Sequence, residues 1–266
     1  MGVIQRRFRG WRITSATFTF ILLISCSLED VEKNEACILE EVQFDDYNRL
    51  KFTTISGGKI YQVKQEFTFE GETDVVASFQ FTYFKDSLVI RNQLESTPTK
   101  LPFISVKFEG DRPLEVIKYF PSSDVKLIHE FDYSVDNRIR INLTRVASNG
   151  QSLFAAFANY YIDSKGNVFQ LESYALDRET ATEFVKVEDR TFIYDSYQSP
   201  MQGMFLPFFA GNYLPDVKFF SRNNVLEIRE NEQNARYEYE YGENDNTLTQ
   251  VQPNGQPVYF SYVNCP

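Results

Sequence analysis

The chain has 266 residues, of which 42% are apolar and 24% charged, and its formal net charge is −10. That length suits one large all-β domain or two small ones, and the apolar fraction permits a substantial core. The negative charge repels nucleic acid, which argues against a nucleic-acid partner, and its simplest role is solubility. With 25 Phe, 16 Tyr and one Trp, the composition favours strands over helices.

Residues 1–25 have the composition of a processing signal and not of a folded segment. Four arginines and no acid accompany the apolar stretch Thr17–Ile24, which is short for a membrane-spanning helix. Leu23-Ile24-Ser25-Cys26 resembles a bacterial lipobox, in which Cys26 becomes the acylated first residue of the mature chain. The alternative is an ordinary secretory leader that leaves Cys26 as a free or paired thiol.

An acidic tract follows Cys26 and resembles the surface-export signal of Bacteroides-type lipoproteins. We therefore expect residues 26–36 to form an acidic linker and residues 37–266 to form a single all-β domain. The expected location is the cell envelope, where the lipid on Cys26 anchors the protein to a membrane. In this interpretation the membrane is the outer membrane, and the domain faces either the cell surface or the periplasm.

The three cysteines fit this interpretation. If Cys26 carries lipid, Cys37 and Cys265 remain, one near each end of the mature chain. An oxidising compartment would let them pair, and closing so long a loop contributes about 4–5 kcal/mol in the chain-entropy treatment. A metal site is the weaker alternative, because the chain has a single histidine.

Short apolar runs separated by turn residues recur along the whole of the predicted domain. In chain order, the predicted strands of its first half are Val42–Phe44, Leu50–Phe52, Tyr61–Phe69, Phe79–Tyr83, Leu88–Ile90, Val106–Phe108 and Leu114–Val116. The segment Glu95–Pro102 carries two prolines and breaks the ladder.

The clearest hairpin lies near the middle of the chain, where Val125–Tyr133 and Arg138–Ile141 flank an Asp-Asn turn. The remaining predicted strands are Phe154–Ile162, Val168–Leu171, Thr191–Asp195, Val225–Ile228, Arg236–Tyr241 and Val258–Tyr262. An aromatic residue closes most approach strands, and we expect these rings to gather on one buried face. They are Phe44, Tyr83, Phe108, Tyr133, Tyr194, Tyr241 and Tyr262.

The segment Ser199–Pro215 differs from the rest, because it holds three prolines and several Phe and Met residues without a period-two pattern. We expect a long loop with one helical turn. Its residues Phe205, Phe208 and Phe209 are the candidate contacts for a ligand or a partner protein. The alternative is a cap that covers the end of the sheet or fills its interior.

These elements predict an all-β fold made of a single large antiparallel meander of roughly a dozen strands or more. The intervals between hairpins vary too much for a solenoid of fixed period. A sheet of that size accumulates twist, and its free edges invite aggregation. We therefore expect it to be strongly curved or closed into a barrel-like sheet, with one long Pro/Phe-rich loop.

The repeated unit of an aromatic pair, an Asx- or Gly-rich turn and an apolar return is similar to the tyrosine-aspartate repeats of large secreted β-proteins. Residues 37–265 more closely resemble a lipoprotein family of Bacteroides-type bacteria with a porin-like fold. The match is carried by the lipobox, by the hairpins, and by Tyr194-Asp195 with the Pro-aromatic loop and Ser221–Val225 after it. The family commonly has Asn-Pro where this chain has Ser199-Pro200. The resemblance implies a fold, but it implies no activity and no site residue.

Catalytic signatures are missing from the sequence. The single histidine, His129, shares a strand face with Leu127 and Phe131, which indicates a packed, structural role. There is no nucleophile elbow, phosphate-cradling glycine loop or two-cysteine zinc pair. Oxygen-rich turns at Asp163–Asn167 and Glu243–Asn246 are explained by turn chemistry without calcium. We therefore assign no catalytic residue, no cofactor and no metal ligand.

The preferred hypothesis is a non-enzymatic cell-envelope lipoprotein that binds an unknown ligand or scaffolds an envelope protein partner. One alternative is an envelope glycoside hydrolase with paired carboxylates, since acids are plentiful. Another is an outer-membrane β-barrel, against which the charged residues on the strand faces argue.

Overall fold

The computed structural model describes residues 37–55, 59–93, 103–120, 125–177, 183–205, 214–231 and 233–264. The predicted processing signal, the lipidated Cys26 and the acidic linker up to residue 36 lie outside the described residues. So do Phe208, Phe209 and Cys265.

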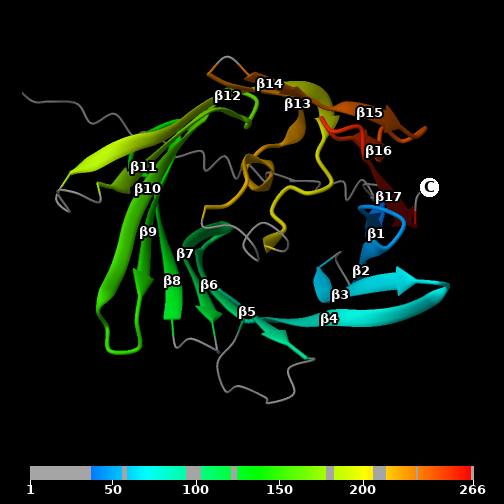
Figure 1. The fold of residues 1–266 in the computed structure, drawn as a ribbon, viewed down its shortest axis with the longest axis horizontal. Helices are drawn as coiled ribbons and strands as arrows, with labels where there is room; N and C mark the ends of the chain where they lie inside the picture. The colour runs from blue at the N-terminus through cyan, green and yellow to red at the C-terminus, as the bar shows by residue number, and fades with distance from the viewer. Residues whose placement is uncertain are drawn as a thin grey trace, which may run out of the picture. The chain divides into compact units, whose positions relative to one another are not determined.

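The described residues form a single sheet of 17 strands (Figure 1). The first nine strands are β1 (Ile38–Gln43), β2 (Asn48–Thr54), β3 (Ile60–Phe69), β4 (Glu72–Tyr83), β5 (Ser87–Asn92), β6 (Ile104–Glu109), β7 (Arg112–Phe120), β8 (Val125–Asp132) and β9 (Arg138–Val146). The other eight are β10 (Ser152–Ile162), β11 (Val168–Leu176), β12 (Phe184–Gln198), β13 (Asn223–Glu230), β14 (Gln233–Arg236), β15 (Glu238–Tyr241), β16 (Thr247–Val251) and β17 (Pro257–Val263). A 3-10 turn, η1 (Val217–Phe219), precedes β13.

Strand pairing follows the order of the chain and then returns to its start. From β1 to β14 each strand pairs antiparallel with the next, and β15, β16 and β17 continue the series. β17 pairs back with β1, where Phe260 stands opposite Val42. β14 and β15 flank Tyr237, whose amide donates to the Leu226 carbonyl of β13 at 2.9 Å. The sheet is therefore nearly closed into a barrel, which confirms the predicted curved antiparallel meander.

Several hairpin turns have residues that suit their backbone conformations. Asn137, in the predicted Asp-Asn turn between β8 and β9, has a φ of 58°, a left-handed value that Asn tolerates. Between β10 and β11, Asp163 Oδ1 accepts the amides of Lys165 and Asn167, each at 2.9 Å. Its carboxylate is therefore used in the turn, as predicted. Across the described residues, no group of three His, Cys, Asp or Glu side chains could hold a metal ion.

Side chains alternate between an apolar interior and a polar outer wall. On β8, His129 is fully buried and stands opposite Leu143, while the next residue, Glu130, is exposed and stands opposite Asn142. The His129 ring Nδ1 lies 3.3 Å from the Val116 carbonyl oxygen. The predicted face of His129, shared with buried neighbours on the same strand, is confirmed.

The aromatic residues that close the approach strands pack mostly as expected. Five of the seven lie partly buried against the apolar core: Phe44, Phe108, Tyr133, Tyr194 and Tyr262. Tyr83 departs from the prediction, because 38% of it is exposed. It stands just before the β4–β5 turn, where Lys59 Nζ lies 5.4 Å from its ring centroid. The Tyr83 ring therefore lies near the surface, where it contacts the Lys59 ammonium group, and it does not pack into the apolar core.

The long Pro/Phe-rich loop between β12 and β13 enters the ring of strands, as Figure 1 shows by its yellow and orange trace. We call its described parts, residues 199–205 and 214–222, the inner loop. Met201, Phe205, Val217 and Phe219 of the inner loop are buried in the same core as the strand residues. A 3-10 turn, η1, follows Pro215. The helical turn expected within Ser199–Pro215 stays a prediction, because residues 206–213 lie outside the described residues. Within the part of the chain that the structure describes, no helix is long and apolar enough to cross a membrane.

The outer wall carries the ion pairs, and one of them gives the fold a dependence on pH. On β11, the Glu172 carboxylate accepts hydrogen bonds from Lys186 Nζ at 2.6 Å and from the Tyr161 hydroxyl at 2.9 Å. The bond from Lys186 holds the pKa of Glu172 below its usual value, although burial opposes this. The stability that this group adds is therefore present above its unfolded pKa of about 4.3 and is lost as pH falls through the lower, folded value.

We expect Glu172→Gln to lower the free energy of unfolding by about 1 kcal/mol at neutral pH, a figure kept small by solvent screening. Denaturant titrations at neutral pH and near pH ~3 should show this difference shrinking at the acidic end. Glu240→Gln, on the exposed side of β15, is the matched control and should change little at either pH. A difference that stayed constant with pH would contradict the prediction.

Candidate functional site

A pocket of about 600 Å³ lies between the inner loop and the strands β6 to β10. Its wall residues come from the ends of these strands, from the β6–β7 and β8–β9 turns, and from both described parts of the inner loop. This volume falls in the range of small-molecule sites. The inner loop supplies Gln202, Gly203, Phe205, Phe219 and Phe220 to the wall of the pocket.

Aromatic rings line the pocket from the strand wall to the inner loop. The Phe108 ring of β6 meets Phe205 edge-on, with ring centroids 5.9 Å apart. Phe205 lies 5.1 Å from Phe219, and Phe219 lies 4.9 Å from Phe220. Ile139 of β9 extends the apolar lining on the other side. This lining offers apolar contact area to a ligand.

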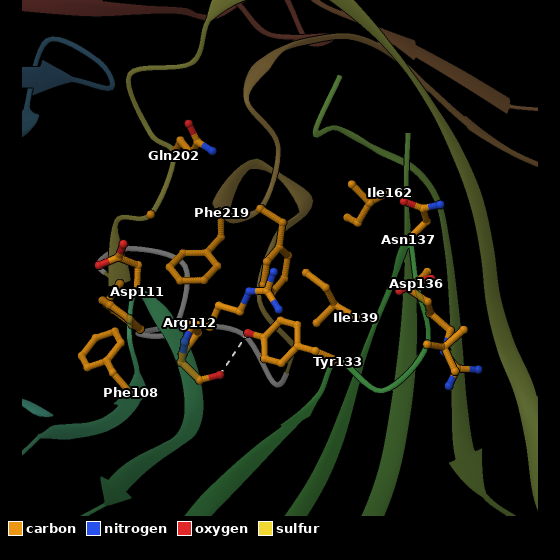
Figure 2. A pocket seen from close by; sticks show the side chains of 16 residues that line it. Phe108, Asp111, Arg112, Tyr133, Asp136, Asn137, Ile139, Ile162, Gln202 and Phe219 are labelled. Atoms are coloured by element: carbon orange, nitrogen blue, oxygen red, sulfur yellow. Dashed lines mark hydrogen bonds between the residues drawn. The ribbon is translucent and has the colours of Figure 1, made fainter. Parts of the chain in front are cut away.

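Arg112, the first residue of β7, is exposed and supplies a cation to the lining of the pocket. Figure 2 shows its guanidinium in the middle of the pocket, between Phe219 and Tyr133. The guanidinium carbon lies 5.4 Å from the Tyr133 ring centroid. None of the ion pairs formed within the described residues involves Arg112. Its five donors are therefore not engaged by a carboxylate of the wall.

Tyr133 supports Arg112 and remains a neutral phenol. Its hydroxyl donates to the Pro113 carbonyl oxygen at 3.0 Å, the dashed bond in Figure 2. Burial raises the pKa of Tyr133 well above its ordinary value, and the nearby positive charge of Arg112 offsets only part of that rise. The side chain therefore keeps its proton in the hydrogen bond and adds no negative charge next to Arg112.

Two carboxylates also line the pocket, each from a turn. Asp111 belongs to the β6–β7 turn and Asp136 to the β8–β9 turn, and both are exposed. In Figure 2 they lie on opposite sides of the pocket, with Arg112 and Tyr133 between them. The pocket thus combines an apolar lining with two arginines, Arg112 and Arg138, and two acids.

The structure places some of the residues singled out in the sequence. Phe205 is 9% exposed and forms part of the pocket wall, while Phe208 and Phe209 lie outside the described residues. A role of these rings in ligand contact stays a prediction. Cys37 is disulfide-bonded, but Cys26 and Cys265 also lie outside the described residues, so the proposed pairing stays a prediction.

The sequence reasoning missed Arg112, Phe219 and Phe220. Arg112 follows a Glu-Gly-Asp turn and reads as an ordinary exposed residue of that turn. Phe219 and Phe220 lie beyond Pro215, where the predicted loop ended. A weak signal existed, because Phe108 and Tyr133, which flank this region of the pocket, both belong to the series of closing aromatics.

No protein-family model matches the chain, and no curated protein matches its sequence. Solved structures do resemble it. A porin-like protein from Bacteroides vulgatus ATCC 8482 has a TM-score of 0.56 at 15% identity and covers 86% of this chain and 99% of its own. A porin-like protein from Bacteroides uniformis ATCC 8492 has a TM-score of 0.51 at 14% identity, with coverages of 84% and 94%. The expected porin-like β fold is therefore confirmed, at the level of fold.

Proposed function

We propose that this protein is a non-enzymatic lipoprotein of the cell envelope whose barrel binds a small ligand in the pocket beside the inner loop. The pocket is the observation that carries the proposal, because it joins a volume of about 600 Å³ to an apolar lining and a few polar groups. The sequence at Cys26 supports a lipid anchor in the outer membrane. The porin-like proteins of Bacteroides that share the fold support an envelope location.

The outer wall supports a barrel that faces water. Across β8 and β9, Glu130 stands opposite Asn142 and Asp132 stands opposite Arg140 on the side away from the core. A barrel that spans a membrane needs a continuous apolar band on this side, because charges there are costly in lipid. The buried side, in contrast, holds a connected apolar core that includes Val42, Ile90 and Ile141. This distribution favours a tethered, water-facing barrel over a membrane-spanning one.

A glycoside hydrolase is the second candidate, and one observation favours it. Asp111 and Asp136 both line the pocket, and hydrolysis of a glycosidic bond commonly uses two carboxylates that flank the bond. The binding proposal is preferred, because the arginine and the rings between the two acids are groups that hold a ligand.

The test uses the full chain with Cys26→Ser, which removes the acylated sulfur, and the neutral fluorescent probe phenylnaphthylamine. We expect saturable binding to one site. Ile139→Trp should weaken binding about tenfold or more, because the indole occupies pocket volume. Ile117→Trp, on the outer side of β7, is the matched control and should leave binding unchanged.

Equal binding by both variants would show that the probe lies elsewhere and would count against the proposal. Turnover of an aryl glycoside that Asp111→Asn abolishes would favour the hydrolase instead.

A further inference from the structure

We propose that the pocket selects an amphipathic monoanion, a ligand with one carboxylate or sulfonate on an apolar body. The anionic group pairs with Arg112, and the body lies against the phenylalanine rings of the wall. This inference rests on the proposed function, because it names the class of ligand for the same pocket. It is carried by the position of Arg112, by the ring series, and by the two acids.

Arg112 is placed to recognise a negative charge. Its guanidinium stands among rings and not at a carboxylate, with Phe219 on one side and Tyr133 on the other (Figure 2). Arg112 is an exposed residue, and its guanidinium can form charge-assisted hydrogen bonds, which are stronger than those between neutral groups, with an anion that enters the pocket. The planar guanidinium also matches a carboxylate or sulfonate with two parallel bonds. The Tyr133 hydroxyl already donates its proton to the Pro113 carbonyl oxygen, so the anion is bound by Arg112.

The lining carries two acids, Asp111 and Asp136, as well as two arginines, Arg112 and Arg138, so a ligand with several negative charges would meet acids as well as cations. Asp111 and Asp136 lie on opposite sides of the pocket, so a second anionic group that extended away from Arg112 would approach one of them. Like charges repel, and this repulsion disfavours a ligand with a second negative charge. A cationic ligand could meet the acids, but it would place its charge in a pocket whose centre holds Arg112. The arrangement therefore favours a monoanion.

The remainder of the pocket fits an apolar body. The rings of Phe108, Phe205 and Phe219 form one connected series, with neighbouring centroids 5.9 Å and 5.1 Å apart. Phe205 and Phe219 are buried in the core and so are held in place before a ligand arrives. Preformed walls of this kind reduce the entropy lost on binding. The acyl chain of a fatty acid and the rings of an aromatic acid both suit them.

The test compares two probes with the same rings in the full chain with Cys26→Ser. Anilinonaphthalene sulfonate is the anionic probe, and phenylnaphthylamine, which lacks the sulfonate, is the neutral one. We expect the anion to bind about tenfold more tightly than the neutral probe. Arg112→Gln should remove this advantage, so that the two probes bind with about equal affinity. Arg229→Gln, an exposed arginine of β13, is the matched control and should preserve the advantage.

The outcomes separate this inference from the function on which it rests. If the neutral probe binds in the pocket but the anion has no advantage, or Arg112→Gln does not remove it, the ligand class is wrong and the binding function stands. If neither probe binds, or Ile139→Trp blocks neither, the binding function fails as well. Competition against bound anilinonaphthalene sulfonate tests which apolar body the ligand carries. Displacement by dodecanoate or by naphthoate supports the proposal. If neither compound displaces the probe, the proposal is overturned. Thermal melting of each variant verifies that it is folded.

Discussion

Replacing Tyr160 with alanine is expected to lower the free energy of unfolding by about 3–5 kcal/mol. Tyr160 lies on β10 and is fully buried, with its ring 4.8 Å from Phe220 of the inner loop. Its hydroxyl donates to the Pro215 carbonyl oxygen at 2.8 Å. Truncation would leave a cavity at the centre of the core and would also remove a direct link between the barrel wall and the inner loop.

Two further variants separate these contributions in denaturant titrations. Tyr160→Phe keeps the ring but leaves the Pro215 carbonyl without this donor, so a loss of about 1–2 kcal/mol is expected. Tyr161→Ala changes the next residue, whose side chain lies on the outer wall and donates to Glu172, and a loss of at most about 1–2 kcal/mol is expected. If Tyr160→Ala were no more destabilising than Tyr161→Ala, the inner loop would not be held by this residue.

The alternation of side chains along each strand could be predicted, because it is a local property of the sequence. Successive residues of a strand face opposite sides, so the apolar positions around His129 predict its burial directly. The Asp-Asn turn before Arg138 likewise fixes a hairpin, since the left-handed conformation at Asn137 suits few other residues. Neither inference needs any knowledge of distant parts of the chain.

The closing of the sheet could not be located in this way, because it joins the two ends of the described domain. Val42 stands opposite Phe260, and no local pattern in either strand names the other as its partner. The twist of a large sheet predicted curvature, but the register of the β1–β17 pair depends on every intervening hairpin. The sequence therefore predicts the fold class, but it does not predict which two strands close the sheet.

The pocket depends on the same distant contacts, which explains why its central residue was missed. Arg112 lies in the middle of the pocket only because the inner loop brings Phe219 to the wall more than one hundred residues later. The sequence marked the loop as unusual through its prolines and phenylalanines. It did not indicate which strand ends the loop meets, since that is decided by burial of the whole apolar set.

The second large effect is expected at Asp195, which connects β12, β13 and β15. Its carboxylate accepts the Tyr197 amide at 3.0 Å, the Asn224 amide at 3.1 Å and the Asn224 side-chain amide at 3.2 Å. It also accepts the Tyr241 hydroxyl, whose pKa is raised by burial and by this hydrogen bond. The β12–β13 register shifts between Tyr194 and Gln198, so Asp195 occupies the point where the backbone ladder is interrupted. Its side chain therefore replaces ladder bonds that the backbone does not make.

Asp195→Ala is expected to destabilise the barrel by about 3 kcal/mol, because it leaves the Asn224 amide and the Tyr241 hydroxyl without this acceptor. Asp195→Asn keeps one acceptor oxygen and should lose about half as much. Asp74→Ala, on the exposed part of β4, is the control and should change stability by at most about 0.5 kcal/mol. Denaturant titrations of the three variants rank them, and equal losses for Asp195→Ala and Asp74→Ala would contradict the assignment. The inner loop begins within a few residues of Asp195 and ends just before Asn224. An interruption of the ladder held by one carboxylate is thus what lets the chain leave the wall, enter the barrel and form the pocket.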